Sequence, residues 1–476
     1  MRDHKRRPSP DDDVGPPGGR IEDPILRKLR RGPGIEPDAR HLRKHELGSG
    51  RERPTGRGLV GWLQILGPGL ITGAGDDDPS GIGTYSQVGS RFGYGMLWTA
   101  LFTFPLMAAV QELCARIALQ TGVGLGTSLR RKFPSWLVGL CIIALFVANT
   151  FNVGADLGAV AAGGSLLSRG AVHQLWLVVP VAALILALQM FLAYGAIFKI
   201  FKWLTVALFA YVITGVIVHP DLRQVVTGSL VPHVELSKDY IAALVAILGT
   251  TISPYLFFWQ ASSEVDEMRA AGKSTERTRR GVGRRELRTA RIDIAIGMLF
   301  SNLVMYFIML TSAAVLHAGG KTDIQTAEGA AQALAPLAGE WAFVLFALGM
   351  IGTGLLAIPI LTGSAAYAVR DFFGLKGALA DRPAYRPTFY AFMALSTLAG
   401  VLIDLAGINP IRALFVSAVI NGVVAPPVLV LIVLLGTSRE IMSRRVSGRV
   451  SRTLTWITAV AMGLAALALV VALVAP

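Results

Sequence analysis

Charged residues are scarce in this sequence. Asp, Glu, Lys and Arg together make up 16% of the 476 residues, whereas 53% are hydrophobic. Soluble domains carry about 25% charged residues, so this composition excludes a string of ordinary soluble domains. The apolar runs are continuous and do not alternate over about ten residues, which also excludes a transmembrane β-barrel. The sequence therefore predicts an all-α integral membrane protein that lies in a lipid bilayer.

Cysteine and histidine are missing from positions where they could form disulfides, bind a metal or catalyse a reaction. Cys114 and Cys141 are the two cysteines, and both fall inside apolar segments, so no disulfide framework or zinc motif is available. The seven histidines lie in the N-terminal tail or near the ends of apolar runs. The chain has neither a His-Glu-x-x-His pair nor a Gly-x-Ser-x-Gly turn. We therefore expect no enzymatic activity and no cofactor.

Residues 1–58 differ in composition from the rest of the chain. They carry 15 of the 45 Lys and Arg and contain no apolar core. Such a segment lacks both the apolar surface needed to fold alone and the features of a cleavable signal. We expect a disordered, basic cytoplasmic tail at 1–58 and a transmembrane domain at 59–476.

Long apolar runs alternate with short basic links from residue 59 onward. About 20 apolar residues span a bilayer, and the chain repeats that length eleven times. If the N-terminus is cytoplasmic and the C-terminus outside, the inner links hold 23 Lys and Arg and the outer links six, as expected in a plasma membrane. The net charge of +14 thus indicates orientation signals and not nucleic-acid binding. The predicted spans are 59–90, 96–120, 136–168, 174–194, 197–218, 241–264, 290–316, 332–370, 388–405, 408–436 and 453–474.

Helix breakers interrupt two of these spans. Glycines, three acids and a proline fall together at 73–81 in the first span, and Ser253 and Pro254 interrupt the sixth. Proline removes a helical hydrogen bond, and carbonyls freed in lipid need partners, so such breaks persist where they line a cavity. Breaks in spans one and six are typical of secondary transporters built from two five-span repeats, with the substrate at the breaks.

Two other interpretations stay open at this point. Residues 59–75 could form a short complete span, which would leave Asp76, Asp77 and Asp78 on the outer surface. Pro254 could be an ordinary kink, which is common in membrane helices. A carboxylate buried in the membrane costs at least about 2.5 kcal/mol, so buried acids usually have a function. The pairing of the two breaks favours a substrate site.

The first three spans resemble those of a known family. Residues 78–81 (Asp-Pro-Ser-Gly) and 89–94 (Gly-Ser-Arg-Phe-Gly-Tyr) resemble the first-span signature of the NRAMP family of divalent-metal transporters, which reads Asp-Pro-Gly-Asn and then Gly-Ser-Lys/Arg-Phe-Gly-Tyr. Arg116 and Asp156 match positions in the family's second and third helices. The resemblance covers 59–476 and implies the leucine-transporter (LeuT) fold, with spans 1–5 and 6–10 as inverted repeats and helices 1 and 6 broken.

The chain departs from the family at the implied metal site. Of the family's ligands the aspartate is retained, as Asp78, whereas Gly81 stands at the asparagine and Ser253 at the methionine. Tyr255 and Gln260 replace the two sixth-span histidines. Thioether sulfur favours softer metals, so its loss favours hard ions such as Mg²⁺ or Mn²⁺. The candidate substrate-binding residues are Asp78, Gly81, Gly75, Thr250, Ser253, Tyr255 and Asn421, and the candidate metal ligands are Asp78, Asp77 and Ser253.

The same departures leave a second function open. Metal transport could be lost altogether, and the chain would then carry a small organic solute on the same scaffold. The aromatic residues 255–259 would line that pocket, and the helix N-termini near Pro79 and Pro254 would hold an anionic group.

Coupling to protons is also left open by the sequence. Histidine titrates near neutral pH, but none lies mid-span, and Ala159 stands where the family has a glutamate used in proton movement. Asp78 and Asp156 are the remaining candidates, although Asp156 could instead form a structural pair with Arg116 between spans. A monomer suffices for any of these mechanisms.

Overall fold

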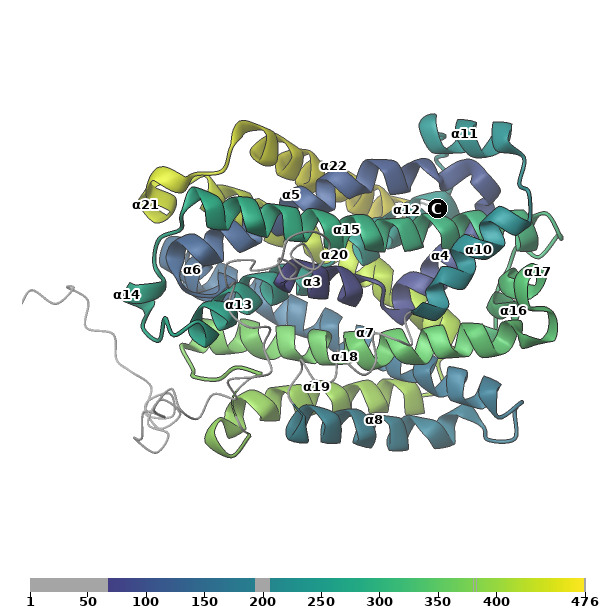
Figure 1. Cartoon of the computed structure of the whole chain (residues 1–476), viewed down its shortest axis with the longest axis horizontal. Coiled ribbons are helices and arrows are strands. Elements are labelled where there is room, and N and C mark those ends of the chain that lie inside the picture. Colours follow the sequence, from purple (N-terminus) through teal and green to yellow (C-terminus); the bar gives the residue numbers. More distant parts are fainter. Residues whose placement is uncertain (1–66, 193–205, 380, 382, 475–476) are drawn as a thin grey trace, which may run out of the picture. The chain divides into compact units, whose positions relative to one another are not determined.

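The computed structural model describes residues 67–192, 206–379, 381 and 383–474, and the regular elements of this part are all helical (Figure 1). In these residues nine helical stretches are long and apolar enough to cross a membrane. They comprise α5 (Trp98–Thr121), α7 (Ser135–Leu167), α8 (Gln174–Phe191), α12 (Lys238–Thr251) with α13 (Pro254–Ala270), α15 (Arg284–Ser312), α18 (Ala342–Phe373), α19 (Pro387–Leu405), α20 (Pro410–Gly436) and α22 (Arg449–Val474).

Two further helical regions occupy the predicted first and fifth spans. α3 (Pro68–Asp76) and α4 (Pro79–Phe92) form the first, and α10 (Phe209–Ile217) belongs to the fifth. The beginning of each of these spans lies outside the described residues, as does the predicted tail at 1–58. Short helices complete the links: α6 (Leu125–Lys132), α11 (Leu222–Leu230), α14 (Glu276–Arg279), α16 (Ala327–Ala331), α17 (Ala335–Ala338) and α21 (Arg439–Met442). The predicted all-α membrane fold is confirmed.

Both predicted breaks are true interruptions of the helix. α3 ends at Asp76 and α4 starts with Pro79 at its first turn, where a missing backbone N–H costs nothing. α12 ends at Thr251 and α13 starts with Pro254 in the same way. The Ser253 hydroxyl donates to two carbonyls of α12, Gly249 O at 2.8 Å and Thr250 O at 2.7 Å. Carbonyls freed by the break are thereby satisfied inside the protein, so an ordinary kink at Pro254 is excluded.

Glycines bring the first half of each broken helix against a neighbouring backbone. A Cβ atom at Gly73 would lie 2.3 Å from Gly297 O, and one at Gly297 would lie 2.2 Å from Gly69 O. α3 and α15 therefore touch through their main chains. On α12, a Cβ at Gly249 would lie 2.0 Å from Ala418 O of α20. Close approach at small residues is the usual basis of helix packing in membranes, and here it fixes the position of both breaks.

A separate group of helices supports the broken pair from one side. α7 packs against α18, α19, α8 and α20, and α18 packs in turn against α19. Figure 1 shows α18, α19 and α8 running side by side, with α7 next to α18 and nearer the broken helices. α7 thus connects this layer to the α3–α4 junction.

Candidate functional site

Three consecutive acids lie buried at the junction of α3 and α4. Asp76, Asp77 and Asp78 are 0%, 3% and 1% exposed. The interpretation that places them on the outer surface is therefore wrong, because α4 continues the span beyond them and neighbouring helices enclose the junction. In this conformation the acids are closed off from solvent.

Asp78 collects donors from three elements. Its Oδ1 atom accepts from Gly81 N at 2.7 Å and from the Ser80 hydroxyl at 2.7 Å, both on α4. Its Oδ2 atom accepts from Asn152 Nδ2 on α7 at 3.0 Å and lies 3.3 Å from the Tyr255 hydroxyl on α13. One carboxylate thus caps α4 and joins it to the third and sixth spans.

The two helix breaks meet at this carboxylate. The Tyr255 hydroxyl lies 3.2 Å from Gly75 O, a carbonyl at the end of α3, and Ser80 Oγ lies 3.4 Å from Thr250 Oγ1 of α12. A Cβ atom at Gly81 would lie 3.4 Å from Thr250 Oγ1. Gly75, Gly81, Thr250 and Tyr255 are therefore gathered around Asp78, and the packing at Gly81 is tight, since a Cβ there would also lie 3.2 Å from the Tyr85 ring.

Asp77 and Asp76 face a different helix. Ser301 Oγ on α15 donates to Asp76 Oδ2 at 2.5 Å and lies 3.1 Å from Asp77 Oδ1. The other oxygens, Asp76 Oδ1 and Asp77 Oδ2, have no hydrogen-bond partner in the described residues. Among those residues, no three or more His, Cys, Asp and Glu side chains come together as a metal cage. A cation beside Asp78 would therefore meet one carboxylate with its neutral hydrogen-bond donors, while Asp76 and Asp77 lie toward α15 at the same junction.

The last two candidate residues, Ser253 and Asn421, are less closely associated with Asp78. Ser253 lies at the second break, but its hydroxyl proton is donated to the α12 carbonyls described above. Asn421 on α20 is 1% exposed, and neither of its amide atoms has a hydrogen-bond partner within the described ranges. Its neighbour Gly422 contacts Val245 O of α12. Asn421 thus lies on the helix that packs against the sixth span, and in the described residues no hydrogen bond joins it to Asp78.

The predicted pair of Asp156 and Arg116 is wrong. The Arg116 guanidinium instead binds Glu112, with Nε 3.2 Å from Glu112 Oε1. Glu112 lies one helical turn before Arg116 on α5, which is the spacing at which side chains on one helix meet. Asp156 is buried in the middle of α7 and faces the backbone N–H of Ser80 at the start of α4, with no side-chain hydrogen-bond partner in the residues described.

Several polar residues at the junction are not predicted by the sequence pattern. Asn152 donates to Asp78, Ser301 binds Asp76 and Asp77, and Thr72 Oγ1 donates to Gln260 Oε1 at 2.5 Å, which links α3 to α13. One signal could have identified Asn152: it precedes Asp156 by four residues, which places both on one face of α7. Nothing in the pattern around Ser301 distinguishes it from other serines in membrane helices.

The similarity of this chain to known proteins extends over nearly all of its described residues. A sequence model of the family described as natural resistance-associated macrophage protein-like (Nramp) matches residues 69–472. Proteins named divalent metal cation transporter MntH are similar to this chain: that of Bacillus subtilis is 26% identical over 85% of this chain and 91% of its own length, and that of Deinococcus radiodurans 27% identical over 89% and 93%.

Two solved structures share the fold. The Eremococcus coleocola manganese transporter, solved in complex with an aromatic bis-isothiourea substituted compound, superposes with a TM-score of 0.69 at 18% identity over 89% of each chain. Mhp1, a nucleobase-cation-symport-1 family transporter, superposes with a TM-score of 0.51 at 16% identity, covering 90% of this chain and 93% of its own. Mhp1 is not named as a divalent-metal transporter, so the shared fold does not by itself identify the substrate.

Proposed function

We propose that this chain, which belongs to the Nramp family, is a secondary transporter that carries a divalent metal cation across the membrane by alternating access. The observation that carries this proposal is Asp78, a buried carboxylate at the point where both broken helices meet. An acid kept at such a position is costly and is typical of an ion pathway. The related proteins are named for divalent metal cations, which supports this substrate over an organic solute.

The donors at the junction favour a hard ion. In the described residues, the side chains that contact Asp78 are those of Ser80, Asn152 and Tyr255, so neither sulfur nor imidazole is among them. Mg²⁺ prefers oxygen ligands and retains several waters, binding through one or two carboxylates. The lack of a multi-acid cage in this part of the chain fits an ion that keeps part of its water shell. We therefore propose Mg²⁺ or Mn²⁺ as the substrate.

Movement at the two breaks would open the closed junction. The short segments between α3 and α4 and between α12 and α13 are the natural places for half-helices to pivot. We propose Asp156 as the group that couples protons to this movement, because it is a fully buried carboxylate on α7, one turn after the Asn152 that binds Asp78, and buried membrane carboxylates are typical of proton relays. The proposed location is the plasma membrane, with the N-terminus cytoplasmic and the C-terminus outside.

Uptake by the purified full chain in proteoliposomes tests the proposal. We expect saturable entry of Mg²⁺ and Mn²⁺, followed with an ion-sensitive dye inside the vesicles. Isothermal titration of the same protein with each ion would give the binding step. If folded protein neither binds nor carries either ion, the metal proposal fails, and a screen of small organic solutes becomes the next experiment.

A sulfur introduced at the second break should change the ion preference. Ser253→Met places a thioether beside the Asp78 junction, and thioethers favour softer metals. We expect Cd²⁺ to compete with Mg²⁺ uptake on the order of tenfold more effectively than in the wild type. Ser253→Ala is the matched control, because it removes the same two hydrogen bonds to α12 without adding sulfur. Equal selectivity in both variants would place Ser253 away from the ion.

A further inference from the structure

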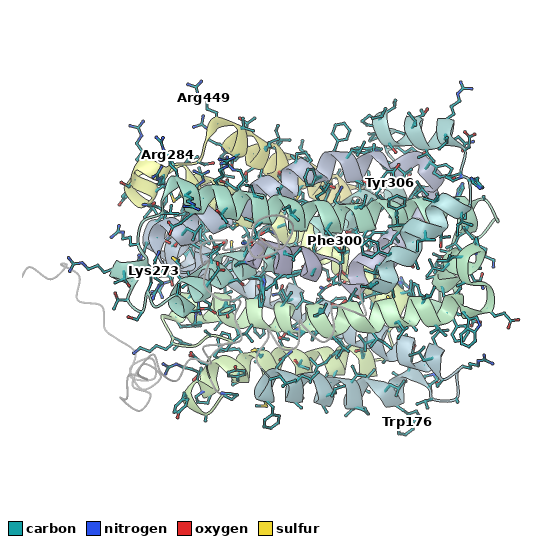
Figure 2. All side chains as sticks on the ribbon, in the orientation of Figure 1. Trp176, Lys273, Arg284, Phe300, Tyr306 and Arg449 are labelled. Atoms are coloured by element: carbon teal, nitrogen blue, oxygen red, sulfur yellow. The ribbon has the colours of Figure 1, made fainter. Side chains whose placement is uncertain are left out.

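A polar cavity shares no lining residue with the Asp78 junction and lies at the end of the helix bundle where α5 ends and α15 begins. Its volume is about 310 Å³, and Leu287 and Val446 supply its apolar lining. Figure 2 labels Arg284 and Arg449, the first residues of α15 and α22, and both lie at this end. The charged residues that line the cavity are Arg116, Arg284, Arg288, Arg291 and Arg445.

Two of these arginines are held in place by a buried acid. Glu112 is 6% exposed, and its Oε1 atom accepts from Arg116 Nε at 3.2 Å and from an Arg291 nitrogen at 3.2 Å. Ser451 at the start of α22 donates to Glu112 Oε2 at 3.0 Å. Arg116 itself is 7% exposed. The cavity thus has a fixed, charged wall built from α5, α15 and α22.

The other three arginines pair with no carboxylate in the described residues. Arg445 Nε donates to Val282 O at 3.1 Å, which positions the side chain without neutralising it. The side chains of Arg284 and Arg288 are exposed and make no hydrogen bond or ion pair within the described ranges. Glu112 therefore offsets only part of the positive charge, and several guanidinium groups around one hollow are left to meet an anion.

We propose that this cavity binds a phosphate group, supplied by the headgroup of an anionic lipid. Guanidinium groups match phosphate oxygens in planar, paired hydrogen bonds, which explains why arginine and not lysine lines the hollow. Arg284, Arg288 and Arg291 precede the apolar part of α15, which begins near residue 292, so the cavity lies where a membrane helix meets the headgroup layer. Basic pockets between helices at this depth are typical binding places for acidic lipid headgroups.

Free inorganic phosphate has the same chemistry, and the experiment separates the two sources. The full chain in detergent is examined by native mass spectrometry with phosphatidylglycerol or with zwitterionic phosphatidylcholine, and by isothermal titration with inorganic phosphate. The test variant is Arg284→Gln/Arg288→Gln, whose side chains make no described contact that folding would lose. The control is Arg277→Gln/Arg285→Gln, which removes two exposed arginines outside the cavity.

We expect the first phosphatidylglycerol to bind about 20-fold more weakly to the test variant than to the wild type, and the control to bind within about twofold of the wild type. Phosphatidylcholine should show no such difference. If inorganic phosphate alone binds the wild type and loses affinity in the test variant, the site is a phosphate site whose ligand is soluble, and the lipid assignment is overturned. Equal weakening in the two double variants, or no weakening for either phosphate source, would reduce the cavity to part of a diffuse basic surface.

Discussion

Asp78→Asn is expected to reduce ion uptake by at least about 100-fold, equivalent to roughly 2.7 kcal/mol, while the protein still folds. Asparagine keeps an oxygen that can accept from Gly81 N and the Ser80 hydroxyl, and it serves as well as aspartate at a helix N-cap. The variant therefore removes the negative charge that a divalent cation needs and leaves the cap of α4 in place.

The new amide should fit without a polar clash. Its nitrogen would face Asn152 Nδ2, but Asn152 can rotate its amide to present Oδ1, which has no hydrogen-bond partner in the described chain. The measurements are proteoliposome uptake of Mg²⁺ and Mn²⁺ and the thermal midpoint in detergent. The matched control is Asp323→Asn, which makes the same change on an exposed loop. Uptake near the wild-type rate in Asp78→Asn would leave Asp78 as a helix cap only.

Gly297→Ala is expected to have the second large effect, on folding. A Cβ atom at this position would lie 2.2 Å from Gly69 O, which belongs to the main chain of α3 and cannot rotate away. The two helices must separate, and overpacking of this kind costs about 1–3 kcal/mol. We expect a lower thermal midpoint, less folded protein from membranes, and about tenfold slower ion uptake, because α3 carries the acids at its end.

Gly463→Ala gives the matched comparison. Gly463 also lies within a membrane helix, α22, but a Cβ there would meet only Pro426 Cβ at 3.9 Å, an ordinary contact. We expect the thermal midpoint and the uptake rate of this variant to equal or slightly exceed those of the wild type, since alanine favours helix over glycine. Similar losses in both variants would mean that glycine flexibility, and not close packing of α3 on α15, is what matters.

The resemblance of residues 78–81 to a family motif identified the central acid, but not the hydrogen bonds that it accepts. Gly75 and Thr250 were predicted because breaks stand out against an apolar run, whereas Gly81 and Tyr255 were predicted from the resemblance, and Asp78 from both. Ser253 stays a predicted ligand, and the structure adds that its hydroxyl proton is donated to two carbonyls of α12. Position along the chain shows that a residue lies at a break. The direction of its side chain depends on how the helix is rotated, which the pattern does not give.

The predicted pair of Asp156 and Arg116 failed for the same reason. Both residues were correctly placed in their spans, and opposite charges in lipid are expected to pair. The choice of partner depended on Glu112, one turn away on the same helix, and on Arg291 and Ser451, which reach it from α15 and α22. Such networks join residues separated by more than a hundred positions, so spacing along one helix reveals only their nearest members.

The sequence by itself determined the helical membrane fold, the approximate spans and the two breaks. These properties depend on the thickness of the bilayer and on the backbone chemistry of proline and glycine, which act along a short stretch of chain. Only the tertiary structure decided that Asn152, Ser80 and Tyr255 share one carboxylate, that Asp77 turns to Ser301, and that five arginines surround one cavity. Those arrangements depend on the rotation and close approach of helices distant in sequence, which glycine contacts such as that of Gly297 with Gly69 fix in three dimensions.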